Sequence, residues 1–278
     1  MGVEPTGARC SRPPTDFEDR GAHRDTSTPM ATVQHTPSRA ARQIAPGAAT
    51  PIVRVPSSPL PILALIPAHN EAGRIGRVVA GVLPFLPVLV VDDGSTDATA
   101  GEARAAGAEV LCQSPNQGKG TALQAGFRYA LDEGCVAVVT LDGDGQHDPA
   151  EIPQFLAAYA ARQADLIIGA REYRLMPPLR RLSNTLGRWL FSWALGQYVR
   201  DNQSGYRLVS RRLMEATLAS QERGFEFEVE MIVVAARGGY RIEWVPIRTI
   251  YSGQPSHIRK WHHLVHFLRM VRQTRCTR

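Results

Sequence analysis

The sequence predicts an α/β fold with a mostly parallel central sheet and flanking helices. Two observations predict it: short uninterrupted apolar runs alternate with longer amphipathic segments, and polar loops directly follow the apolar runs. An apolar run without alternation is typical of a strand that is buried on both faces, as strands of parallel sheets are. Strands that alternate with helices at this spacing form parallel sheets with right-handed crossovers.

The alternation starts near residue 61 and continues to about residue 169. The expected strands cover residues 62–66, 88–91, 109–111, 135–141 and 165–169. The expected helices cover residues 71–83, 97–106, 121–132 and 149–161. Ligands of such sheets bind beyond the carboxyl ends of the strands, so we expect the loops that follow the strands to carry the function.

The composition is that of an ordinary globular protein. The chain has 278 residues, of which 44% are hydrophobic and 21% are charged, which is enough apolar material for a sizeable core. No run of 18 apolar residues is present, which excludes a transmembrane helix. The four cysteines lie far apart without a CxxC pair, so they indicate no zinc cluster and favour a reducing, cytoplasmic setting.

The two ends of the chain differ from the domain that we expect over residues 59–256. Residues 1–58 show no periodic apolar pattern, so we expect a disordered N-terminal extension, with a misassigned start codon as the alternative. Residues 257–278 carry five arginines and Lys260 without an acid, and they have an apolar face. We expect a basic amphipathic helix on an anionic membrane surface. No nucleic-acid-binding motif supports the rival partner, RNA.

Four consecutive expected strands end in polar or acidic loops. The loops begin at Pro67, Asp92, Asn116 and Asp142. An Asp-Gly-Ser segment alone is more often a turn and a helix N-cap than a binding site. Four such loops at one edge of a parallel sheet are not explained by turn chemistry, and together they predict a binding site.

The loop after the fourth expected strand has the composition of a cation site. Asp142 and Asp144 are separated by one glycine and are followed by Gln146, and such oxygen ligands favour Mg²⁺ or Mn²⁺. An EF-hand would need Gly and Glu where this chain has His147 and Pro153, so that interpretation fails. A plain acidic turn is the remaining alternative.

In order, the loops contain Pro67-x-x-Asn-Glu, Val-Val-Asp-Asp-Gly-Ser-Thr-Asp, Gly-Lys-Gly and Leu-Asp-Gly-Asp-Gly-Gln-His. In this order and spacing they resemble the inverting family 2 glycosyltransferases, and among these the dolichyl- or polyprenyl-phosphate sugar synthases. The resemblance covers about residues 61–256. It implies a GT-A-like fold, a UDP- or GDP-sugar donor, and Mg²⁺ or Mn²⁺ held at the Asp-x-Asp loop.

The resemblance also implies site residues, position by position. The donor-binding residues would be Pro67, Ala68, His69, Glu71, Asp93, Lys119 and Asp142. Asp93 would accept a hydrogen bond from the base, and His69 stands where many relatives have Tyr or Phe. The metal ligands would be Asp142, Asp144 and Gln146, with Asp144 counted as catalytic.

Arginines after the fifth expected strand would bind the acceptor. In the synthases that the chain resembles, arginines here bind the lipid phosphate. Arg171 and Arg181 match best and would be catalytic, and Arg174 is a possible third. A planar guanidinium suits a phosphate because it can donate to two oxygens at once. The alternative is a solvated basic surface.

An apolar helical stripe follows these arginines. Its members are Leu182, Leu186, Trp189, Leu190, Trp193 and Leu195. Such a stripe is either core or a helix lying in a membrane interface. The next segment, residues 201–207, resembles a family signature that packs near the acceptor. Of the two acids Glu226 and Glu228, one would be a general base for a hydroxyl acceptor. A phosphate acceptor is already ionised, so we expect both to be structural.

The sequence therefore predicts a glycosyltransferase that moves a sugar from a nucleotide sugar to a polyprenyl phosphate. We expect it to be cytoplasmic and peripheral at the inner face of the membrane. A saccharide or small-molecule hydroxyl acceptor and a non-catalytic nucleotide-sugar-binding protein are the alternatives. A phospho-receiver module would need an Asp ending the third strand and a Lys ending the fifth, where this chain has Cys112 and Ala170.

Overall fold

The computed structural model of the protein describes residues 61–171, 178–248 and 250. The expected N-terminal extension, the expected C-terminal helix and the predicted acceptor residue Arg174 lie outside these residues, so those expectations stay predictions. Side chains at the start of the helix that follows residue 177 are also not described, and this includes the side chain of Arg181.

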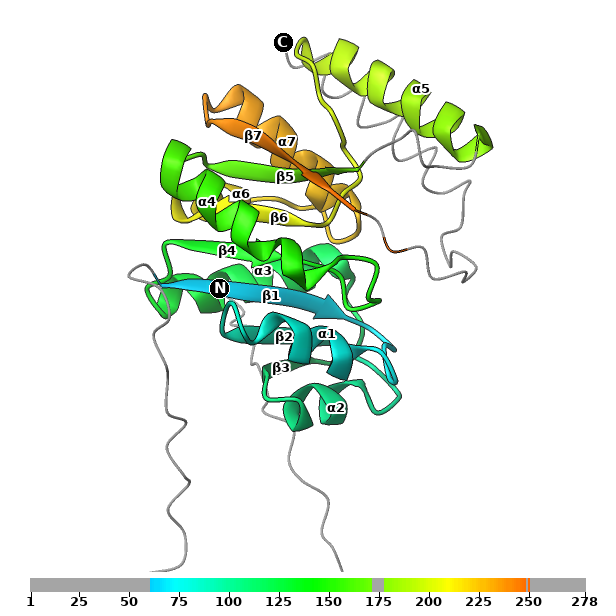
Figure 1. The fold of residues 1–278 in the computed structure, drawn as a ribbon, viewed down its shortest axis with the longest axis vertical. Helices are drawn as coiled ribbons and strands as arrows, with labels where there is room; N and C mark the ends of the chain where they lie inside the picture. Colours follow the sequence, from blue (N-terminus) through cyan, green and yellow to red (C-terminus); the bar gives the residue numbers. More distant parts are fainter. Residues whose placement is uncertain (1–60, 172–177, 249, 251–278) are drawn as a thin grey trace, which may run out of the picture. The chain divides into compact units, whose positions relative to one another are not determined.

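A seven-stranded sheet forms the centre of the described domain (Figure 1). Its strands are β1 (Ile62–Ala68), β2 (Val88–Asp93), β3 (Glu109–Gln113), β4 (Ala137–Thr140), β5 (Leu166–Arg171), β6 (Arg207–Ser210) and β7 (Ile242–Ile247). Their order across the sheet is β3-β2-β1-β4-β6-β5-β7. All the neighbouring pairs are parallel except the two that involve β6, which runs antiparallel to β4 and β5. The prediction of a mostly parallel sheet is therefore confirmed.

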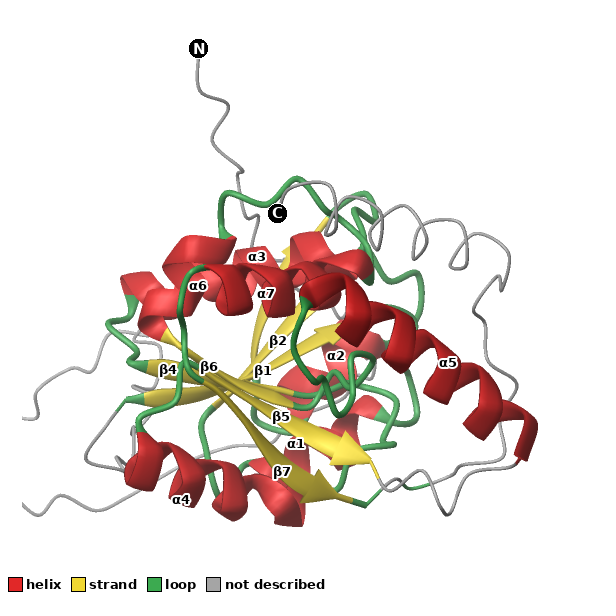
Figure 2. Ribbon diagram, turned by 90° about the horizontal axis from the view of Figure 1, so that it is seen from above, coloured by secondary structure: helices red, strands yellow, loops and turns green. Residues whose placement is uncertain are grey.

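Helices cover both faces of this sheet (Figure 2). The helices are α1 (Ile75–Val82), α2 (Thr99–Ala105), α3 (Lys119–Asp132), η1 (Pro149–Glu151), α4 (Ile152–Arg162), α5 (Pro178–Leu195), α6 (Arg211–Thr217) and α7 (Glu226–Arg237). Residues of α1, α2 and α4 join one buried cluster, and residues of α3, α5, α6 and α7 join the other. No helix among the described residues is both long and apolar enough to cross a membrane.

The central strand β1 shows why the apolar runs form strands. All seven of its residues are buried. Successive side chains of a strand point to opposite faces, so Ile66 joins the cluster under α1 while Leu65 joins the cluster under α3. A run that is apolar at every position can fill both cores at once, which a helix with one apolar face cannot do.

The strand β6 and the helix α6 are among the elements that were not predicted. The strand β6 is only four residues long and begins with a charged residue, Arg207, so it lacks the apolar run that marked the other strands. It nevertheless pairs with β4, with Arg207 opposite Thr140. Because β6 is antiparallel, the residues that precede it lie at the edge of the sheet where β4 ends. This reversal brings residues 201–206 to the carboxyl edge of the sheet.

The stripe predicted on α5 divides between two surfaces. Of the predicted stripe, Leu195 packs against the core, whereas Trp189 and Trp193 are 63% and 53% exposed. The buried residues Phe191 and Ala194 of α5 were not part of the predicted stripe. The core interpretation is therefore wrong for the two tryptophans. The physical reason is that Trp189 and Trp193 are at positions i and i+4, about one helical turn apart. Both side chains therefore lie on the same side of α5, opposite the side that packs against the core.

Candidate active site

The loops that follow β1, β2 and β4 meet at one edge of the sheet, as predicted. The register places Ala68 of β1 beside Asp92 of β2, and Leu65 of β1 beside Thr140 of β4. Asp142 follows β4 two residues later, so it enters this edge next to the loop after β1. The third loop, which leads from β3 into α3, completes the group by placing Lys119 at the N-terminus of α3.

The loop after β1 is held by side chains from the loop after β2 and from α2. Four successive backbone N–H groups donate: Asn70 to Ser95 Oγ (2.9 Å), Glu71 to Thr99 Oγ1 (2.7 Å), Ala72 to Asp97 Oδ2 (3.2 Å) and Gly73 to Glu102 Oε2 (2.6 Å). Because these N–H groups donate to side chains of another segment, the residues just before Ile75 form a separate turn. The helix α1 therefore begins at Ile75 and not at residue 71 as expected. The polar residues after β2 therefore hold the loop that carries His69 and Glu71.

His69 is exposed, and hydrogen bonds at both of its ring nitrogens orient the ring. Its Nδ1 lies 2.9 Å from the backbone oxygen of Asp93, and its Nε2 lies 3.1 Å from Nδ2 of Asn70. A carbonyl oxygen can only accept, so Nδ1 carries the proton and Nε2 accepts from the Asn70 amide. The two hydrogen bonds therefore hold the ring in one orientation.

The carboxylate of Asp93 is engaged with the loop that leads into α3. This carboxylate is buried and accepts hydrogen bonds from the backbone N–H groups of Gln117 (2.7 Å) and Gly118 (2.8 Å). Both oxygens thus hold the loop that leads into α3. Gly118, with φ of 98°, makes the turn there. A direct contact of Asp93 with a base stays a prediction.

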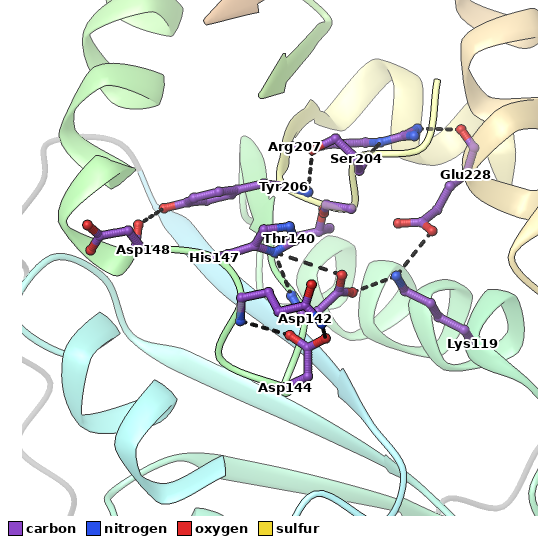
Figure 3. Close-up of polar contacts among 12 residues, drawn as sticks. Lys119, Thr140, Asp142, Asp144, His147, Asp148, Ser204, Tyr206, Arg207 and Glu228 are labelled. Atoms are coloured by element: carbon purple, nitrogen blue, oxygen red, sulfur yellow. Dashed lines mark hydrogen bonds and ion pairs between the residues drawn. The ribbon is translucent and has the colours of Figure 1, made fainter. Parts of the chain in front are cut away.

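The two carboxylates of the Asp-x-Asp loop have different partners (Figure 3). Asp144 accepts from the backbone N–H (2.9 Å) and from the side-chain amide (2.7 Å) of Gln146. Asp142 lies deeper, where its Oδ1 accepts from Nζ of Lys119 at 2.5 Å. Within the residues that the structure describes, no three His, Cys, Asp or Glu side chains gather as a metal-binding group. The two carboxylates supply the hard oxygens that Mg²⁺ and Mn²⁺ prefer, so the donor set fits such an ion.

Charge at this edge shifts several pKa values. Burial alone would raise the pKa of Asp142, but the adjacent Lys119 ammonium lowers it to about 2. Burial lowers the pKa of His147, whose Nδ1 accepts from the Asp142 backbone N–H at 3.2 Å. Burial, together with the charges of Asp144 and Asp142, raises the pKa of Glu71 despite the opposing effect of Arg74. Three carboxylates, those of Glu71, Asp142 and Asp144, therefore interact at this edge, and Lys119 is paired with Asp142.

The prediction did not include Gly205 or Tyr206 in the site, and it treated Glu228 as only structural. Glu228 Oε2 lies 3.1 Å from Lys119 Nζ, on the side away from Asp142. Tyr206 donates to the Asp148 backbone oxygen (3.1 Å) and its ring contacts that of His147 at 5.1 Å between centroids. The resemblance of residues 201–207 to a family signature was the available signal, but it pointed toward the acceptor. The structure places Gly205 and Tyr206 beside the Asp-x-Asp loop.

Arg171 is the one predicted acceptor residue whose side chain the structure describes. Its Nε and Nη2 donate to Asp201 at 2.7 and 3.0 Å, and Asp201 is fully buried. Arg171 also contributes to the low pKa of Asp142, which places its charge near the Asp-x-Asp loop. Arg181 lies in the first turn of α5.

The sheet, with helices on both faces and the acidic edge, has the GT-A fold of glycosyltransferases. The chain belongs to glycosyl transferase family 2, whose family model, "Glycosyl transferase family 2", matches residues 64–219. It is a glycosyltransferase enzyme.

Two relatives and one solved structure illustrate the similarity. The chain is 34% identical over 204 residues to the undecaprenyl-phosphate mannosyltransferase of Micrococcus luteus, an alignment that covers 67% of this chain and 82% of the relative. It is 34% identical over 208 residues to the polyprenol monophosphomannose synthase of Mycolicibacterium smegmatis, covering 66% and 76%. The fold matches glucosyl-3-phosphoglycerate synthase from Mycobacterium tuberculosis, in complex with Mn²⁺, UDP and phosphoglyceric acid, with a TM-score of 0.61. This match has 22% identity and covers 78% and 77% of the two chains.

Proposed function

We propose that the protein transfers one sugar, with inversion, from a UDP- or GDP-sugar to a polyprenyl phosphate. The observation that carries the proposal is the position of Arg171, which ends β5 at the same edge of the sheet as the Asp-x-Asp loop and is held there by Asp201. A phosphate bound by Arg171 would lie next to a donor bound at the Asp-x-Asp loop. The names of the two polyprenyl-phosphate relatives support the same acceptor class.

Each group of the site has a part in this reaction. Asp142 and Asp144 would hold Mg²⁺ or Mn²⁺, which would neutralise charge on the leaving nucleotide diphosphate. Arg171 would orient the acceptor phosphate, and Asp201 holds Arg171 through two hydrogen bonds. The phosphate oxygen attacks the anomeric carbon of the sugar while the bond to the diphosphate oxygen breaks on the opposite side.

A hydroxyl acceptor is the second candidate, and the position of Glu228 argues against it. A hydroxyl needs a general base within hydrogen-bond reach. Glu228 is only 6% exposed and forms an ion pair with Lys119, so it is not directed at an acceptor in the open part of the site. An acceptor phosphate is already ionised and needs no such base.

An exposed aromatic surface on α5 and just after it supports a membrane-bound acceptor. Trp189, Trp193 and Tyr198 are all more than half exposed, and the Arg188 guanidinium lies over the Tyr198 ring at 5.8 Å. Exposed Trp and Tyr flanked by arginine are typical of helices that lie in the interface of an anionic membrane. We therefore propose peripheral binding to the cytoplasmic face of the membrane through α5, and through the predicted C-terminal helix.

The test is a donor panel. UDP- and GDP-sugars are incubated with the full chain, polyprenyl phosphate and Mn²⁺, and the lipid is analysed by mass spectrometry. We expect one donor to add one sugar mass to polyprenyl phosphate and none to add it to the dephosphorylated polyprenol. Transfer to the free polyprenol, or to soluble saccharides alone, would show that the acceptor is a hydroxyl and that the proposal is wrong.

A further inference from the structure

The Lys119 ammonium lies between two carboxylates that differ in their access to solvent (Figure 3). Its Nζ is 2.5 Å from Oδ1 of Asp142 and 3.1 Å from Oε2 of Glu228. The side chain of Asp142 is 31% exposed, that of Lys119 is 14% exposed, and that of Glu228 is 8% exposed. Asp142 is therefore on the open side of the lysine, and Glu228 is on the closed side.

The surrounding backbone keeps the two carboxylates in place. A Cβ atom on Gly205 would lie 2.9 Å from Oδ2 of Asp142 and 3.0 Å from Oε1 of Glu228, so both carboxylates pack directly against the main chain at Gly205. Glu228 belongs to the first turn of α7, and its backbone oxygen accepts from Nη1 of the buried Arg207. Arg207 thus fixes the backbone of Glu228, and the carboxylate packs between Gly205 and Lys119.

Asp142 and Glu228 share one ammonium. Both carboxylates contact Nζ of Lys119, and the next cation, the buried Arg207, donates to the backbone oxygen of Glu228. A divalent cation that binds Asp142 would share this carboxylate with the Lys119 ammonium. The two positive charges would then lie a few ångströms apart in a site largely shielded from bulk water, where like charges repel strongly. Lys119 has Glu228 as a second partner on the side away from the open part of the site.

We propose that Lys119 is a built-in counter-ion that competes with the divalent cation for Asp142, and that Glu228 is the positioning residue that retains the Lys119 ammonium when the cation binds. The inference rests on the cation site of the proposed function and goes beyond it. Lys119 neutralises Asp142 while no cation is bound. It then stays at the site, held by Glu228, as a positive charge next to the leaving diphosphate.

The test measures Mn²⁺ binding to the full chain without donor or acceptor, from the loss of the free-ion electron paramagnetic resonance signal. The variants are Lys119→Met, Glu228→Gln and the double variant, with Asp142→Asn as the control for the site. Methionine keeps most of the length of lysine without its charge. The double variant removes both charges of the buried pair, which guards against unfolding caused by an unpaired Glu228.

We expect Lys119→Met to bind Mn²⁺ roughly tenfold more tightly than the wild type, because a like charge has been removed from the ligand. Glu228→Gln should bind Mn²⁺ more weakly than the wild type. In this variant Asp142 is the remaining carboxylate partner of Lys119, so the ammonium competes more strongly with the cation. The gain from removing Lys119 should therefore be larger in the Glu228→Gln background than in the wild type. Asp142→Asn should lose the binding.

Three results would overturn the inference. Unchanged or weaker Mn²⁺ binding in both lysine variants would show that Lys119 does not compete with the cation. Equal gains in the two backgrounds would show that Glu228 acts only as an independent charge and does not position Lys119. Unchanged binding by Asp142→Asn would place the ion elsewhere. Sugar transfer by the wild type is measured separately, so a failure here with transfer intact leaves the proposed function standing.

Discussion

Arg171 and Asp201 form an ion pair of two hydrogen bonds, with Nε donating to Oδ2 at 2.7 Å and Nη2 donating to Oδ1 at 3.0 Å. Asp201 is fully buried, and it also accepts from the backbone N–H of Gln203. Burial alone would raise the pKa of Asp201, but the bonds from Arg171 lower it. The carboxylate is therefore ionised at neutral pH and holds the guanidinium at the end of β5.

We predict that Arg171→Ala raises the KM for polyprenyl phosphate about tenfold to a hundredfold, which is the loss of a charge-assisted contact of roughly 1.5–3 kcal/mol. The KM for the donor should change much less. Arg162→Ala is the matched control, since Arg162 pairs with Glu243 on the surface and is 55% exposed. Steady-state kinetics with each substrate varied checks this. Equal effects of Arg171→Ala on both substrates would place Arg171 away from the acceptor.

Asp144→Asn and Asp142→Asn should both abolish sugar transfer, because each removes a charge from the cation site. Their effects on stability should differ. Asp144 is half-exposed and bonds within its own turn to Gln146, so its substitution should leave the melting temperature nearly unchanged. Asp142 pairs with Lys119, so its substitution should cost about 1–3 kcal/mol. Thermal melts and activity with and without EDTA test this; full activity in EDTA contradicts the role of the ion.

Gly205→Ala should reduce activity strongly. The added methyl group would lie within 3.0 Å of both oxygens of Asp142 and of Oε1 of Glu228, so it would push the carboxylates away from Lys119. The cost in stability should be about 1 kcal/mol, because the carboxylates can move by a few tenths of an ångström. Gly101→Ala on α2 is the matched control, since a Cβ there meets nothing within 4 Å, and it should be neutral or stabilising. Equal activity of the two variants would mean that the approach at Gly205 is unimportant.

The stability of the fold should depend on the protonation of His147. Burial lowers the pKa of His147 below its ordinary value of 6.5, so the unfolded chain binds a proton more readily than the folded one. The stabilisation is present above pH 6.5 and is lost as the pH falls below it. We expect the melting temperature of the wild type to fall between pH 7 and 5, and that of His147→Asn to fall less. If the melting temperatures of the two proteins fall equally between pH 7 and 5, the prediction is wrong.

Replacing Trp189 and Trp193 together by Ser should weaken binding to anionic vesicles. Both side chains are more than half exposed on α5. The loss of two large apolar groups that would insert into the membrane should reduce partitioning to vesicles roughly fivefold or more. Leu83→Ser is the matched control, because Leu83 is also exposed but lies beyond the end of α1. Sedimentation with phosphatidylglycerol-rich vesicles measures the effect. If Leu83→Ser weakens binding as much as the double variant, α5 is not the membrane surface.

The sequence by itself determined the alternation of strands and helices from β1 to β5 and the meeting of polar loops at one edge. These features are local. A run such as residues 62–66 is apolar at each position, and the turn residues that end it are its immediate neighbours. The carboxyl ends of parallel strands must then meet, so Asp142 and Glu71 could be assigned to one site before any coordinates were known.

Only the tertiary structure decided what those side chains contact. Glu228 reaches Lys119, and Gly205 reaches Asp142, across long stretches of chain, because the short antiparallel strand β6 pairs with β4 and turns the residues before it toward this edge. A four-residue strand that begins with Arg207 leaves no periodic pattern. Its position is set by the cores on both faces of the sheet, to which residues throughout the domain contribute, so no local segment encodes the contacts that complete the site.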